Sequence, residues 1–132
     1  MRETKHIQPA CLPPPTGNFT WAVQSEKTVY LSGQVGIDAS GKLVAKDAES
    51  QARQIYVNME MTLKELGGNL NSLVRTAIYI VGRENIEAHR RVRRELVASG
   101  RMMKKPASTM LLVAGLAEED WVVEVDAIAV LP

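Results

Sequence analysis

The sequence predicts an α+β domain in which two helices cover one face of a mixed six-stranded sheet. Two long segments repeat apolar residues at helical spacing, and shorter β-branched runs of strand length surround them. The resulting order is β-β-β-α-β-α-β-β, which is typical of helices packed on one side of a sheet. A chain of 132 residues is long enough for one domain with its own core, so we expect a single domain over residues 1–132.

The first strands are predicted before residue 35. Residues 3–8 are expected to form a short edge strand, and the prolines at 13–15 end regular structure because they fix φ and lack a donor. Residues 19–23 and 28–31 then predict a hairpin with a polar turn at 24–27.

Both helices have clear boundaries. Asp47 is a good N-cap for the first, and Gly67-Gly68 ends it. Its apolar stripe consists of Ala48, Ala52, Ile55, Met59, Leu63 and Leu66. The second helix is predicted over 84–98 and ends before Gly100. Its inward positions are Ile86, His89, Val92 and Leu96, with His89 expected at the rim.

The last strand has the composition of a central strand, rich in β-branched and apolar residues. Strands are predicted at 73–81, 107–113 and 121–130. In the last of them Glu124 and Asp126 share one otherwise apolar face, because side chains alternate along a strand. Unpaired carboxylates there would cost much desolvation energy, so this face opens to water, supplies partners or performs chemistry.

With both helices on one face, the opposite face of an apolar sheet needs a cover, so we expect a homo-oligomer.

The composition narrows the possible classes of function, partner and location. The net charge is +1, which argues against nucleic acid as the main partner. A single cysteine, Cys11, excludes an intrachain disulfide, and no signal peptide or membrane span is expected, so the cytoplasm is the expected location. His6 and His89 lack ligand spacing, and no phosphate loop is present; we predict no metal and no cofactor.

The second helix carries a basic cluster made of Arg90, Arg91, Arg93 and Arg94. One interpretation is a solvated face, with Arg91 paired at i, i+4 to Glu87 and Glu95. The other is binding of an anion or RNA. Glu124 and Asp126 also leave two interpretations open. They are structural acids with cationic or backbone donors, or one of them handles a proton in a cleft, where partial burial would raise its pKa.

Several segments match one family in order and spacing. They are Ser32-Gly33-Gln34, the helix start Asp47–Gln54 with Asn58, Pro106-Ala107, Val113-Ala114-x-Leu116 and Val123–Ala129. Over residues 5 to 130 the chain resembles the RidA/YjgF family. The resemblance implies a chorismate-mutase-like fold, a homotrimer whose sheets form a central barrel, and three clefts between subunits. It also implies hydrolysis of enamine/imine intermediates, such as 2-aminoacrylate, to 2-oxo acids and ammonia without a metal or cofactor.

The resemblance assigns site residues unevenly. The family's water-positioning glutamate falls on Glu124, and its Ser-Gly pair falls on Ser32 and Gly33. At the other positions the residue type differs: Phe19 replaces a tyrosine, Ser108 the carboxylate-binding arginine, Met110 a cysteine and Arg90 an asparagine.

The change at Ser108 has the largest predicted effect. A guanidinium binds a carboxylate through two charged hydrogen bonds, whereas serine offers one neutral donor. The loss should cost about 2–4 kcal/mol of substrate binding, which predicts weak activity on 2-aminoacrylate. Arg90 would face the same cleft and could supply a guanidinium from another wall.

Three hypotheses follow. The first is a homotrimer that binds a small, carboxylate-bearing metabolite between subunits and acts as a hydrolase like the 2-iminobutanoate/2-iminopropanoate deaminases. The second is a binding or interaction module without catalysis, which the loss of the arginine and the tyrosine favours. The third, endoribonuclease activity, is reported for some family members and depends on the arginine cluster.

Overall fold

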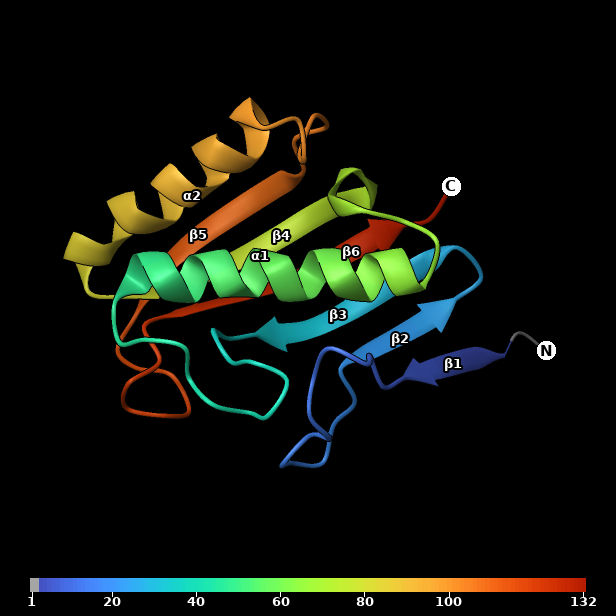
Figure 1. Cartoon of the computed structure of the whole chain (residues 1–132), viewed down its shortest axis with the longest axis horizontal. Helices are drawn as coiled ribbons and strands as arrows, with labels where there is room; N and C mark the ends of the chain where they lie inside the picture. The colour runs from blue at the N-terminus through green and yellow to red at the C-terminus, as the bar shows by residue number, and fades with distance from the viewer. Residues whose placement is uncertain (1–2) are drawn as a thin grey trace.

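The computed structural model describes residues 3–132 as a six-stranded sheet with two helices on one face (Figure 1). The elements are β1 (Thr4–Ile7), β2 (Ala22–Ser25), β3 (Thr28–Gln34), α1 (Ala48–Glu65), β4 (Leu73–Val81), α2 (Ile86–Ala98), β5 (Ala107–Val113) and β6 (Val123–Val130). Short 3₁₀ turns precede β4 and α2. The predicted α+β class, strand number and helix placement are confirmed.

The sheet has the strand order β1-β2-β3-β6-β4-β5. Its only parallel pair is β4 with β5, so the described sheet is mixed as predicted. The strand that comes last in the chain, β6, pairs with β3 on one side and β4 on the other. Its buried residues, Val123, Val125, Ala127 and Ala129, face the helices.

Several predicted boundaries differ from the structure: β1 is shorter than 3–8, β3 continues to Gln34, β6 begins at Val123, and the starts of β2 and α2 also differ. The first hairpin strand begins at Ala22, because Phe19 and Thr20 belong to the loop after the prolines. The Thr20 hydroxyl there donates to the carbonyl of Ile7, and the Ser32 hydroxyl on β3 donates to the carbonyl of Thr20. The second helix begins at Ile86, since residues 83–85 form the 3₁₀ turn.

One buried side chain holds together the segments that flank α1 and β6. The Gln51 amide nitrogen donates to the carbonyls of Ala45 (3.0 Å), Lys46 (3.3 Å) and Asp120 (2.9 Å). Its amide oxygen accepts from the backbone N–H of Val122 at 2.9 Å. Gln51 is fully buried, and its amide satisfies backbone groups of the partly buried segments around it.

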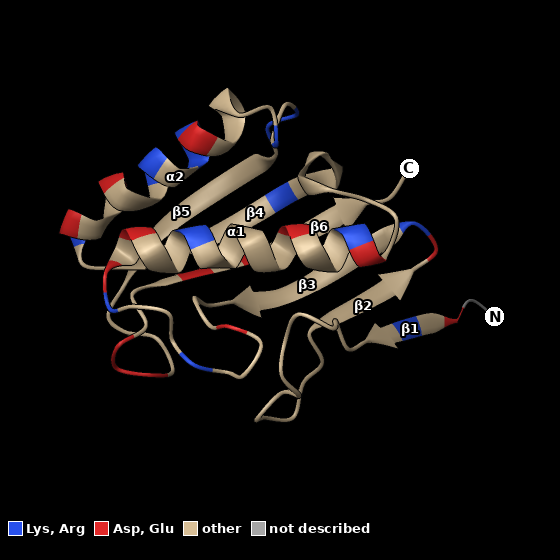
Figure 2. Ribbon diagram, in the orientation of Figure 1, with Lys and Arg blue, Asp and Glu red and all other residues tan. Residues whose placement is uncertain are grey.

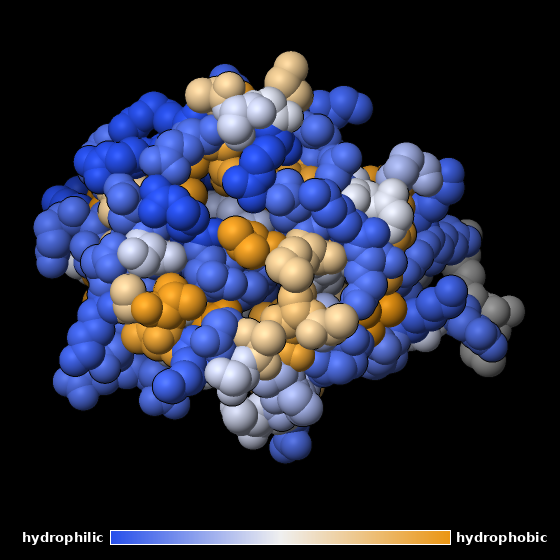
Figure 3. Space-filling view, in the orientation of Figure 1, coloured by the Kyte–Doolittle hydropathy of each residue, from blue (hydrophilic) through white to orange (hydrophobic). Residues whose placement is uncertain are grey.

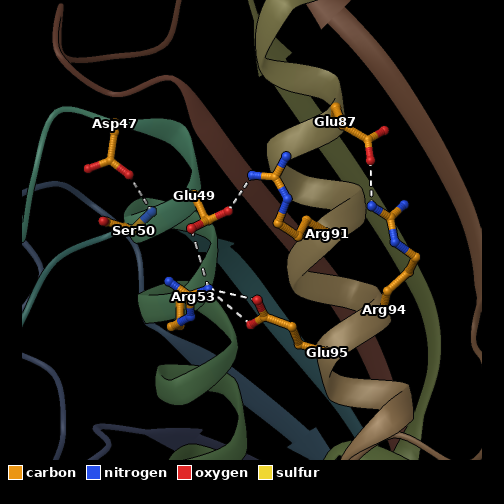
Figure 4. Close-up of polar contacts among 8 residues, drawn as sticks. All are labelled: Asp47, Glu49, Ser50, Arg53, Glu87, Arg91, Arg94 and Glu95. Carbon is orange, nitrogen blue, oxygen red and sulfur yellow. Dashed lines mark hydrogen bonds and ion pairs between the residues drawn. The ribbon is translucent and has the colours of Figure 1, made fainter.

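Charged residues line the outer surfaces of both helices (Figure 2). The predicted pairs of Arg91 with Glu87 and Glu95 are wrong. Arg91 instead reaches Glu49 on α1 at 2.6 Å, and Glu95 pairs with Arg53 at 2.9 Å (Figure 4). The reason is that α1 lies beside α2 and brings Glu49 to Arg91 and Arg53 to Glu95, while Glu87 pairs with Arg94 of its own helix. These exposed pairs contribute little to stability, because solvent screens the charges.

The two faces of the sheet differ in what covers them. Hydrophilic side chains form most of the surface on the helix side, with hydrophobic groups in separate patches (Figure 3). On the face opposite the helices, apolar side chains stay accessible: Tyr30 is 50% exposed, Leu111 49% and Val130 45%. The structure therefore contains the uncovered apolar face that the sequence predicted. Within residues 3–132, neither helix is long and apolar enough to cross a membrane.

Candidate active site

Glu124 lies on the uncovered face of β6, half-buried between β3 and β4. Its side chain passes directly over Gly33, where an added Cβ would lie only 2.2 Å from the Glu124 Oε2 atom. Only glycine permits this approach. No hydrogen bond or ion pair to the Glu124 carboxylate is found within residues 3–132. Burial, and to a smaller extent the charge of Asp126, raise the pKa of Glu124 above its ordinary value.

Asp126 lies on the same face but has a partner. The Tyr79 hydroxyl on β4 donates to Asp126 Oδ2 at 2.8 Å, and this bond, together with desolvation, raises the pKa of Tyr79. The two acids of β6 therefore differ: Asp126 is hydrogen-bonded within the sheet, whereas the carboxylate of Glu124 is available to a ligand.

Ser32 and Phe19 lie on the chain segments next to Gly33. The Ser32 hydroxyl donates to the Thr20 carbonyl at 2.5 Å, and its backbone N–H donates to the Trp21 carbonyl at 2.9 Å. Phe19 is 46% exposed and packs edge-on against Trp21, with ring centroids 5.2 Å apart. The Ser32 hydroxyl thus positions the loop that carries Phe19.

The other predicted residues, Arg90, Ser108 and Met110, meet in a cavity of about 350 Å³ between α2 and the strands β4 and β5. We call it the α2–β5 cavity. Ile78, His89, Arg93 and Arg94 complete its lining.

The two sets of predicted residues lie on opposite faces of the sheet. Ser108 is in register with Thr76, and Thr76 with Ala127, whose side chain is buried beneath the helices. Glu124 is in register with Tyr79 on the other face. Within one chain, a small ligand in the α2–β5 cavity is therefore separated from Glu124 by the sheet.

A buried polar network under α2 was not predicted. The Tyr56 hydroxyl lies 2.7 Å from His89 Nε2 and accepts from Arg93 Nη1 at 3.2 Å. The same Arg93 nitrogen is 3.5 Å from Thr76 Oγ1, which is 2.6 Å from the Ser108 hydroxyl. His89 is only 2% exposed, so its predicted place at the rim is wrong. The available signal was Tyr56, which follows Ala52 by four residues and widens the α1 stripe beneath α2.

The burial of His89 predicts a stability that depends on pH. Desolvation, and then the charges of Arg93 and Arg90, lower its pKa to about 4 from 6.5. Between these two pH values, His89 binds a proton in the unfolded chain but not in the folded chain. The free energy of unfolding that is present above pH 6.5 is therefore lost as the pH falls toward 4. The expected loss is about 3 kcal/mol, measured as urea-unfolding free energy against pH.

Two histidine variants provide the comparison. Replacement of the exposed His6 by glutamine should leave this slope unchanged, while His89→Gln should remove it. An equal slope in the His89→Gln variant would assign the effect to other groups.

Comparisons with known proteins agree with this architecture. A family model described as "Endoribonuclease L-PSP" matches residues 11–131. A mouse protein named 2-iminobutanoate/2-iminopropanoate deaminase is 36% identical over 77 residues, which are 58% of this chain and 57% of that protein.

Two solved structures share the fold over nearly the whole chain. RidA from an Antarctic Psychrobacter is 26% identical, covers 96% of this chain and 99% of that one, and has a TM-score of 0.85. E. coli TdcF with bound serine is 22% identical, covers 97% and 99%, and has a TM-score of 0.88. The family match extends over most of the chain, including both sets of candidate site residues, and on this basis the protein is a member of the RidA/YjgF family.

Proposed function

We propose that this protein hydrolyses a reactive enamine or imine derived from an amino acid, giving a 2-oxo acid and ammonia. One observation carries the proposal: a half-buried carboxylate, Glu124, lies against Gly33 without a hydrogen-bond partner in the described chain. A raised pKa suits a group that both takes and returns a proton near neutral pH. The deaminase name of the mouse relative supports the same chemistry.

Glu124 would act on water. Its carboxylate accepts a proton from water as the water oxygen bonds to the imine carbon, and it passes this proton to the nitrogen, which gives a neutral tetrahedral carbinolamine. It then accepts the hydroxyl proton of the carbinolamine and delivers it to the nitrogen as the C–N bond breaks, so that ammonia leaves and the carbonyl of the 2-oxo acid forms. The backbone of Ser32 and Gly33 and the ring of Phe19 would line this side of the site. The reaction needs no electron acceptor.

The ligand would lie between subunits of a homotrimer. Glu124 and the α2–β5 cavity are on opposite faces of the sheet, so one ligand can touch both only if two copies contribute. The exposed apolar side chains opposite the helices provide a surface for that contact. Small carboxylate-bearing metabolites fit the proposal, and the serine bound to E. coli TdcF is one example of such a molecule.

Ser108 and Met110 would form the second wall. Neither carries a charge, and the Ser108 hydroxyl is already bonded to Thr76. A cation for the carboxylate must therefore come from elsewhere, and the exposed Arg90 in the same cavity is one candidate. Without such a cation the protein would be a binding module that does not turn over imines.

The decisive assay generates imines in place with an amino-acid oxidase and follows the 2-oxo acid as it forms. We expect the protein to accelerate its release from several amino acids, while heat-denatured protein has no effect.

Light scattering should give three times the chain mass of 14.5 kDa. Binding of 2-oxo acids without acceleration would identify a binding module. Cleavage of RNA that disappears when Arg91 and Arg94 are replaced by glutamate would favour a nuclease.

A further inference from the structure

The arginines that reach the α2–β5 cavity differ in what neutralises them. Arg94 is paired with a glutamate of its own helix (Figure 4), and Arg90 is exposed and forms no hydrogen bond with the described residues. Arg93 is half-buried, and its partners there are the hydroxyls of Tyr56 and Thr76. Its charge is thus held in place without a carboxylate to compensate it.

Only one edge of the Arg93 guanidinium is used. Both of its hydrogen bonds come from Nη1, so the N–H groups on Nη2 and Nε have no partner in residues 3–132. A guanidinium with a free edge binds a carboxylate through two parallel hydrogen bonds. The ring of Tyr56 lies 5.7 Å from the Arg93 Cζ atom and adds a cation–π contact that limits its movement.

The network behind Arg93 is rigid. Tyr56 is 1% exposed, and because its hydroxyl accepts from Arg93, its own proton goes to Nε2 of His89. His89 is buried and neutral, so it accepts that proton, and its Nδ1 has no partner in the described residues. A group fixed in this way loses little conformational entropy when a ligand binds.

Arg93 also lies close to the residue that aligns with the family arginine. A single hydroxyl, that of Thr76, connects Arg93 to Ser108. In the cavity lining, β5 contributes the uncharged Ser108 and Met110, and the arginines come from α2.

We propose that Arg93, rather than Arg90, binds the ligand carboxylate through Nη2 and Nε, with Tyr56 and Thr76 as positioning residues. This inference rests on the proposed function and assigns the specificity for a carboxylate to a residue of α2. A ligand with the same skeleton but no negative charge would gain much less from Arg93, because it cannot form the two charge-assisted hydrogen bonds.

Calorimetric titration with 2-oxobutanoate and with its uncharged amide tests the assignment. Arg93→Gln should weaken 2-oxobutanoate binding about 10- to 100-fold and leave the amide within about twofold. Arg93→Lys keeps the charge but loses the paired N–H donors of the guanidinium, so the loss of 2-oxobutanoate affinity should be intermediate. Arg91→Gln is the matched control: it removes one charge from the same helix, but Arg91 pairs with α1 and does not line the cavity, so affinity should not change.

Each other outcome overturns the assignment in a recognisable way. Loss of affinity in Arg90→Gln but not in Arg93→Gln would identify Arg90 as the cation and leave the proposed function intact. Equal losses for the acid and the amide would make Arg93 a structural residue. Arg93→Lys binding like wild type would exclude the two-bond contact. Wild-type protein that neither binds 2-oxobutanoate nor hydrolyses imines would contradict the proposed function itself.

Discussion

Replacement of Glu124 by glutamine is expected to slow imine hydrolysis about 100-fold or more while the protein stays folded. Glutamine has nearly the same shape, but it cannot accept a proton from water. The measurement is the rate of 2-oxo acid release under saturating imine supply, together with the thermal unfolding curve. A variant as active as wild type would remove Glu124 from the mechanism.

The pH profile gives a second measure of the same group. Because the ionised form is the base and the pKa of Glu124 is raised, activity should fall on the acid side at a pH above 4.5. Asp126→Asn removes the nearby negative charge, so this acid limb should move to lower pH with the plateau rate kept. An unmoved limb would mean that another group controls it.

Gly33→Ala tests the position of Glu124 without changing the acid. The new methyl group would overlap the carboxylate, 2.2 Å from Oε2 and 2.8 Å from Cδ, so the side chain must move. Turnover should fall at least 10-fold. Gly115→Ala is the control, since nothing lies within 4 Å of an added Cβ there.

Gln51→Leu is expected to destabilise the fold by about 3–5 kcal/mol, the largest effect on stability that we predict for a single side chain. Leucine fills the same space, but the Val122 N–H and the carbonyls of Ala45 and Asp120 lose their hydrogen-bond partner at a partly buried site. The measurement is the urea midpoint and slope of the purified variant.

Gln54→Leu is the matched control on the same helix. Gln54 donates to the side chain of Asn58 and satisfies no backbone group, so its loss should cost less than about 1 kcal/mol. Equal costs for the two variants would show that the bonds of Gln51 to the flanking segments add nothing to stability.

Local patterns predicted the elements of this fold well. The β4 and β5 boundaries are those expected, and α1 begins after Asp47, which accepts from the Ser50 N–H as an N-cap should. The errors occur where tertiary contacts decide. Arg91 bonds to α1 rather than along its own helix, and Phe19 leaves its predicted strand because Thr20 is held by Ile7 and Ser32.

The site was predictable in parts. Strand alternation and the family pattern pointed to Glu124 and Gly33, and the structure brings these two together. Arg93 could not be singled out among four arginines, because its role depends on Tyr56 and Thr76, which are 37 and 17 residues away in the chain. Such a network depends on how α2 packs against α1 and β4, and local sequence patterns do not encode that packing.

The central position of β6 has a consequence for how the chain folds. Until residues 123–130 have left the ribosome, β3 and β4 each present an open edge, and no strand joins the β1–β3 half to the β4–β5 half of the sheet. Until then the chain exposes two strand edges that the native sheet covers, and edge-to-edge aggregation through them competes with folding. Pairing of β6 covers the open edges of β3 and β4 in one step and joins the two halves of the sheet. We therefore expect the native sheet to form only when β6 pairs.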